Sequence, residues 1–161
     1  MRDERGFTLV ELMVVVAVMG VLAKLVIPQF IGESNRGKAK TEVVGVFAEL
    51  TTKELEYQAT KGSFLAAAAC PASSTGAQQD ITACGAAGGV WAPLKTVMPV
   101  TVAYCSYKVT SGTASQTPMV PAGFSMTAPA TTWFFISATC LIGGTTYKYF
   151  TSSVDTSIQS Q

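Results

Sequence analysis

Hydrophobic and polar positions divide the N-terminal part of the chain into two segments. Residues 12–23 carry no charge, and the wider run 7–31 contains only two charged side chains, Glu11 and Lys24. A run that is apolar on every side, and near the ~20 residues needed to cross a bilayer, is typical of a membrane-spanning helix. We therefore expect residues 7–31 to form an apolar transmembrane helix.

The pattern becomes amphipathic after Lys38. Apolar residues then recur at helical spacing on one face, at Ala39, Val43, Val46, Phe47, Leu50 and Tyr57. Charged residues occupy another face, where Glu42 and Glu56 accompany an i, i+4 pair of Glu49 and Lys53. These patterns predict one long helix over about 7–61, and Gly62 is suited to end it in a left-handed conformation.

The remainder of the chain predicts a loop followed by a sheet. Residues 62–99 are rich in Ala, Gly, Ser and Pro, and we expect them to form a long connecting loop. Runs typical of strands follow at 100–110, 123–127, 133–142 and 145–152. Gly143-Gly144 is a two-residue hairpin signal between the last two runs. The expected fold class is α+β: a small antiparallel sheet of three to four strands within 100–152, packed on the apolar face of the helix.

The composition narrows the possible chemistry. The chain has 161 residues, enough for one domain plus an N-terminal segment, and its net charge is +1. Lysines and arginines are scattered, so no basic stripe predicts a nucleic-acid site. There are no histidines, which removes the commonest general base and transition-metal ligand. Because no Ser/His/Asp set or paired carboxylates are present either, we expect no enzyme activity, cofactor or metal.

Four cysteines form an even set: Cys70, Cys84, Cys105 and Cys140. In a cytosolic protein they would suggest zinc, but no C-x-x-C pair and no histidine completes such a site. Two disulfides are therefore expected, and three pairings are possible. We favour Cys70–Cys84, which would tie down the long loop, together with Cys105–Cys140, on strands that could be neighbours.

A lone carboxylate in an apolar helix requires an explanation. A charged side chain in hydrocarbon costs roughly 2.5–3.5 kcal/mol on insertion scales, and such residues usually pair with a partner and mark function. Glu11 follows a short polar leader that ends in Gly6. The alternative is that Glu11 lies at the edge of the span and is simply solvated.

The string Gly6-Phe7-Thr8-Leu9-Val10-Glu11-Leu12, with the run that continues to Ala17, resembles the N-terminus of type IV pilins and their pseudopilin relatives. The resemblance covers about the first quarter of the chain. It implies that residues 1–6 are a prepilin leader, that a prepilin peptidase cuts after Gly6 and that the same enzyme N-methylates Phe7. It also implies that Glu11 neutralises the Phe7 amine of a neighbour or of its own chain during assembly, and that 32–161 form a globular pilin domain.

Two residues are weak points of the long helix. Gly20 lacks a side chain, and Pro28 removes a backbone hydrogen bond. In relatives of this family the stretch between such residues can unwind when subunits pack into a filament. The alternative is ordinary kinking at Pro28. Lys24 departs from the family, which usually has a small or apolar residue there.

The resemblance implies a structural subunit of a type IV pilus. Its partners would be copies of itself in a helical filament, the prepilin peptidase, and an inner-membrane assembly platform with other pilins. The precursor would reside in the inner membrane and the product in an extracellular pilus. A pseudopilin of a type II secretion system and a minor pilin are the alternatives within the family. A single-span enzyme or binding protein that shares only the anchor is the alternative outside it. Motility, adhesion, DNA uptake and secretion all use the same anchor.

Overall fold

A single long helix begins the part of the chain that the structure describes. The computed structural model describes residues 7–114 and 116–161. Helix α1 spans Leu9–Lys61 without interruption, which confirms the predicted long helix and moves its start from Phe7 to Leu9. Gly62 follows with a φ of 77°, and its N–H donates to the Gln58 carbonyl at 2.7 Å, as expected of a left-handed cap. The chain divides into two compact units between Asn35 and Arg36.

The segment expected to be a loop contains short regular elements. They are strands β1 (Ala67–Cys70) and β2 (Gln79–Asp80), helix α2 (Thr82–Gly85) and the 3-10 helix η1 (Ala92–Leu94). The prediction of an unstructured loop over 62–99 was therefore wrong. Elements of two to four residues are too short to give a periodic signal. Distant partners fix the strands instead, because β1 pairs with β4 and β2 pairs with β3 (Val102–Ala103).

The main sheet has five antiparallel strands in the order β1-β4-β5-β6-β7. Its long members are β4 (Cys105–Gly112), β5 (Trp133–Ile142) and β6 (Thr145–Ser152), and the edge strand β7 covers Gln159–Ser160. The expected three to four strands within 100–152 thus missed the short edges β1 and β7. Gly143 and Gly144 join β5 to β6 with φ values of 60° and 80°, which confirms the two-residue hairpin.

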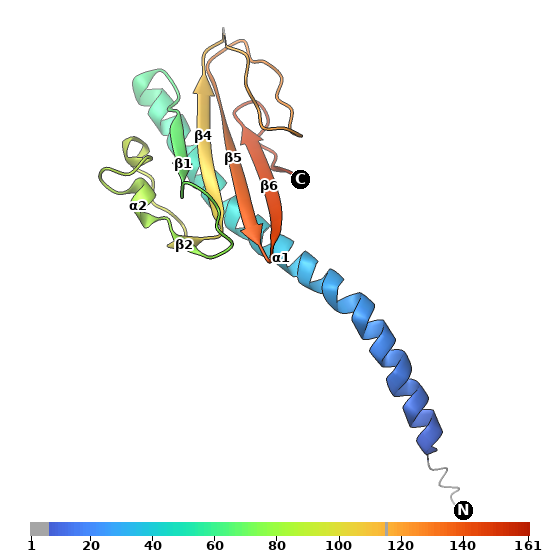
Figure 1. Ribbon diagram of the computed structural model, residues 1–161. Coiled ribbons are helices and arrows are strands. Elements are labelled where there is room, and N and C mark those ends of the chain that lie inside the picture. Colours follow the sequence, from blue (N-terminus) through green and yellow to red (C-terminus); the bar gives the residue numbers. More distant parts are fainter. Residues whose placement is uncertain (1–6, 115) are drawn as a thin grey trace, which may run out of the picture. The chain divides into compact units, whose positions relative to one another are not determined.

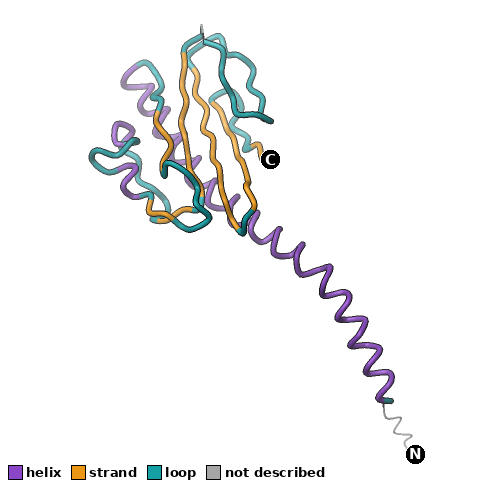
Figure 2. The backbone as a smooth tube through the Cα atoms, in the orientation of Figure 1, coloured by secondary structure: helices purple, strands orange, loops and turns teal. Residues whose placement is uncertain are grey.

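Residues 123–127 form a loop, drawn teal in Figure 2, so the strand predicted there was wrong. Prolines at 118, 121 and 129 cannot donate to a strand ladder, and Gly123 has a φ of 91°. Apolar side chains of residues 120–127, which include this loop, instead pack on aromatic residues of β5 and β6. The resulting outer aromatic cluster comprises Trp133, Phe135 and Phe150, covered by Val120, Phe124 and Met126.

The main core lies on the opposite face of the sheet, against the second half of α1. The predicted apolar face of that helix is buried at Ala39, Val43, Val46, Phe47 and Leu50, with Tyr57 partly buried. It packs on inward-facing residues of the long strands, including Tyr107, Phe134 and Ile136. Figure 1 shows the corresponding part of α1, in cyan, running behind β1, β4 and β5. The predicted packing of helix on sheet is therefore confirmed.

Candidate functional site

The first turn of α1 holds the carboxylate that the sequence singled out. Glu11 Oε2 accepts hydrogen bonds from the Thr8 N–H at 2.9 Å and from the Thr8 hydroxyl at 2.8 Å. The Glu11 N–H donates back to Thr8 Oγ1 at 3.3 Å. This reciprocal arrangement is a capping box, which satisfies backbone donors that a helix start leaves open. This cap was not predicted, although Thr-x-x-Glu ahead of an apolar run is its signature.

The apolar half of α1 presents its side chains to the outside. The described side chains of residues 7–34 are all exposed; Phe7 is 83% exposed and Leu9 75%. The helix contains a window that is long and apolar enough to cross a membrane, and none of that window is buried. So large an apolar surface requires lipid or other helices to cover it.

The structure describes some of the other N-terminal residues that the sequence singled out, but not all of them. Gly6 and the predicted cleavage point after it lie outside the described residues, whereas Phe7 is described and precedes the helix. Both Gly20 and Pro28 have helical backbone, so α1 contains no break between them. Unwinding of this stretch in a filament stays a prediction.

The second half of α1 uses a carboxylate to hold the sheet. Glu42 Oε1 accepts from the Cys105 N–H at 2.9 Å and from the Tyr107 hydroxyl at 2.8 Å, while Oε2 accepts from the Tyr104 N–H at 2.9 Å. The Tyr107 side chain is fully buried, and burial together with the Glu42 charge raises the pKa of its hydroxyl. Glu42 therefore fastens the start of β4 to the helix, rather than lying on a solvated face.

Two more glutamates of α1 bind the backbone of the segment that follows the helix. Glu49 accepts a hydrogen bond from the Val97 N–H at 2.8 Å. Lys53 was predicted to pair with Glu49, but its ammonium lies 2.8 Å from the Glu56 carboxylate. Glu54 is completely buried; its Oε2 accepts from the Leu65 N–H at 2.9 Å, whereas Oε1 has no partner among the described residues. Burial raises the pKa of Glu54 to about 7.

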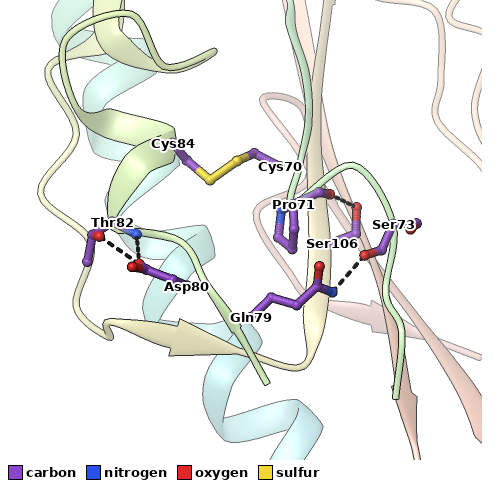
Figure 3. Close-up of a disulfide and its surroundings, with 8 residues drawn as sticks. All are labelled: Cys70, Pro71, Ser73, Gln79, Asp80, Thr82, Cys84 and Ser106. Carbon is purple, nitrogen blue, oxygen red and sulfur yellow. Dashed lines mark hydrogen bonds between the residues drawn. A yellow bond between two sulfur atoms is a disulfide. The ribbon is translucent and has the colours of Figure 1, made fainter. Parts of the chain in front are cut away.

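Two disulfides fasten the same region. Cys70 is bonded to Cys84, and Cys105 is bonded to Cys140, which is the pairing favoured from the sequence. Cys105 and Cys140 are direct partners in the β4–β5 ladder, with Cα atoms 4.0 Å apart. Figure 3 shows the other bridge joining the end of β1 to α2. The Cys70–Cys84 bridge and the three glutamates hold the segment between α1 and β4, whereas Cys105–Cys140 locks β4 to β5.

Comparison with known proteins concerns the N-terminal part of the chain. Residues 1–23 match the prokaryotic N-terminal methylation motif. The chain has a prepilin-type N-terminus. The motif includes Gly6, Phe7 and Glu11, the residues on which the resemblance to pilins rests.

Relatives of the prepilin-type segment come from two kinds of system. The type II secretion system core protein G of Dickeya chrysanthemi is 40% identical over 58 residues, which cover 34% of this chain and 38% of that protein. The protein of the same name from Klebsiella pneumoniae is 35% identical over 77 residues, covering 44% of this chain and 55% of the relative. The type IV major pilin protein PilA of Myxococcus xanthus is 48% identical over 46 residues, covering 27% and 21%.

The similarity stops well short of the full length of these proteins. The chain spans between 36% and 41% of the first three curated relatives that it matches. No solved structure matches the chain. The long helix followed by an antiparallel sheet is nevertheless a pilin-like α+β architecture, so the prepilin-type segment and the fold agree.

Proposed function

We propose that this chain is a structural subunit of a type IV pilus, built around its exposed apolar helix. The observation that carries the proposal is the combination of a methylation motif over residues 1–23 with an apolar helical surface that nothing in the described chain covers. In the precursor, lipid covers that surface and the helix anchors the subunit in the inner membrane. In the filament, the helices of other copies take the place of lipid.

Cleavage after Gly6 creates the second half of the assembly contact. It leaves a positively charged amine at Phe7, which is then N-methylated. Both bonds that Glu11 accepts from described residues end on Oε2, and Oε1 would therefore be the oxygen that meets an ammonium group. An opposite pair in an apolar setting is far more favourable than either ion alone. Docking of a new subunit through its Phe7 amine, or pairing within one chain, therefore neutralises both charges and sets the register.

A pseudopilin of a type II secretion system is the second candidate. It is supported by the several relatives named as type II secretion system core protein G. A minor pilin would use the same N-terminal contact. In each case the chain acts as a structural subunit without catalysis, and its partners are other subunits, a prepilin peptidase and an inner-membrane assembly platform.

The roles of Glu11 are separable by substitution. Glu11→Gln keeps a residue that can complete a capping box, yet it removes the charge. We expect this variant to be processed and retained in the membrane but to give few surface fibres. Glu33→Gln is the matched control, because Glu33 is an exposed carboxylate further along the same helix. Abundant normal fibres from Glu11→Gln would contradict the charge-pairing mechanism.

The location of the mature chain would distinguish a pilus subunit from a subunit of a secretion system. Surface fibres would be sheared from cells, and the N-terminal residue of their main subunit determined. A type IV pilus subunit is expected as the bulk protein of those fibres, starting at N-methylated Phe7. Recovery only in the cell envelope, with loss of protein export on deletion, would favour the pseudopilin. A mature terminus other than Phe7 would contradict the cleavage assignment.

A further inference from the structure

A groove lined by hydroxyl groups lies on the face of the sheet that points away from α1. Its volume is about 330 Å³. The floor is formed by outward-facing residues of β4 and β5, namely Ser106, Lys108, Ser137 and Thr139. Ser73 and Ser74, from the segment between β1 and β2, form a wall. A volume of this size is at the lower end of ligand pockets and suits a single sugar ring.

The wall of this groove is held in place by three separate fastenings. The Cys70–Cys84 bridge fixes its beginning. The Ser106 hydroxyl donates to the Pro71 carbonyl at 2.6 Å, and the Gln79 side chain donates to the Ser73 carbonyl at 2.8 Å (Figure 3). A groove whose wall is already fixed loses less entropy when it binds a ligand than one that must be ordered.

The charged side chains of the strands that form this face are all positive. Strands β4, β5 and β6 contain two lysines and no aspartate or glutamate, and residues 71–78 contain no charged residue at all. In the sheet register Lys108 lies opposite Ser137, and Lys148 lies opposite Thr139. Two strand spacings and two residues separate the lysine Cα atoms by roughly 12 Å. Their long side chains therefore flank the hydroxyl groups of β5, with Lys108 in the groove and Lys148 beside it.

We propose that this groove binds an acidic sugar unit of a polysaccharide. The Ser137 and Thr139 hydroxyls can both donate and accept hydrogen bonds, as sugar hydroxyls require, and the Ser106 hydroxyl, which already donates to Pro71, can still accept one. The Lys108 ammonium supplies the partner for a carboxylate on the sugar, and Lys148 reinforces it. Two lysines release too few counterions to hold a nucleic-acid backbone firmly, so the chemistry favours a saccharide over nucleic acid. This site is independent of the apolar helix and of whether the chain assembles into a pilus or a secretion filament.

The proposal is tested with the full chain in detergent micelles and three probes. Trigalacturonate carries the carboxylated sugar, maltotriose is its neutral counterpart and a short DNA duplex presents phosphates. Calorimetric titration is expected to detect trigalacturonate binding and at least tenfold weaker binding of maltotriose. Lys108→Gln should weaken trigalacturonate binding roughly tenfold, because one charge-assisted hydrogen bond is lost. Ser137→Ala should weaken both saccharides by a smaller factor.

Lys61→Gln is the matched control, since Lys61 is an exposed lysine at the end of α1 and does not line the groove. It should leave the affinity unchanged, and thermal unfolding should verify that each variant is folded. An equal loss of affinity in Lys61→Gln would mean that the net charge of the protein, and not Lys108 in the groove, controls binding, and it would overturn the proposal. Absence of trigalacturonate binding at millimolar concentration would also overturn it. So would tighter, Lys108-dependent binding of the duplex, which would assign the groove to nucleic acid.

Discussion

Replacement of the buried Glu54 by glutamine should stabilise the protein at high pH and not at low pH. The Glu54 side chain is 0% exposed, and burial raises its pKa from 4.5 to about 7. A carboxyl group with a raised pKa binds its proton more tightly in the folded state than in the unfolded state. The folded protein therefore has its full stability below about pH 4.5, loses part of it as the pH rises towards 7, and stays at the lower level above that.

The size of this effect follows from the shift. A difference of about 2.5 pKa units between folded and unfolded states corresponds to roughly 3 kcal/mol of unfolding free energy. The Leu65 N–H favours the charged form, and its effect is already included in that pKa. We therefore expect about 3 kcal/mol. Glutamine has the same shape and can still accept from Leu65, so the comparison isolates the charge.

The assay is urea unfolding of the full chain in detergent micelles between about pH 4 and about pH 8. The free energy of unfolding of Glu54→Gln should match wild type at about pH 4 and exceed it by about 3 kcal/mol at about pH 8. Glu56→Gln removes an exposed carboxylate two residues away and should show no such divergence. A constant difference between Glu54→Gln and wild type across this range would refute the reasoning.

Other substitutions test the remaining contacts. Glu42→Ala should lower the free energy of unfolding by about 3 kcal/mol, because it leaves the buried Tyr107 hydroxyl and two backbone N–H groups without their acceptor. Glu42→Gln should lower it less. Equal stability of Glu42→Ala and wild type in urea would contradict this contact. Gly6→Leu should block processing, so that the chain accumulates at precursor mass in the membrane fraction, and mass spectrometry would reveal normal cleavage if the assignment is mistaken. Joint replacement of Cys70 and Cys84 by serine should cost about 3 kcal/mol in thermal unfolding, given the 14-residue separation; an unchanged melting temperature would count against a stabilising bridge.

The sequence predicted those parts of the fold that repeat a pattern over many residues. The helix over Leu9–Lys61 has such a pattern in both of its halves, apolar throughout in the first and one-sided in the second. The hairpin between β5 and β6 was equally clear, because Gly143-Gly144 separates two runs rich in aromatic and β-branched residues. The prepilin-type segment was identified from a short string whose residue types are unusual together.

The parts that could not be predicted depend on pairing at a distance. Strand β1 is formed from alanines and a cysteine, and only its pairing with β4 makes it a strand. The predicted strand at 123–127 failed for the converse reason, because its apolar residues cover the outer aromatic cluster as a loop.

The roles of the glutamates were missed although spacing contained a signal. Glu54 lies four residues after the buried Leu50 and three before Tyr57, and so continues the apolar face of α1. Glu42 stands between Ala39 and Val46 at the same spacing. A carboxylate in such a position has to accept hydrogen bonds from the packed segment or remain protonated. Glu42 does the first, and Glu54 combines one hydrogen bond with a raised pKa.

The loop over the outer aromatic cluster determines which surface positions can change in sequence without disturbing the fold. Among the described apolar residues between β4 and β5, Val120, Phe124 and Met126 pack on the cluster, while neighbours such as Thr117 and Met119 are exposed. These three apolar side chains hold the loop on the sheet, whereas Gly123 between them is constrained by its φ of 91° and by the adjacent Gln161 side chain. Exposed positions such as Thr117 and Met119 have no comparable constraint. Substitutions at those exposed positions would therefore change the outer surface while the sheet beneath keeps its structure.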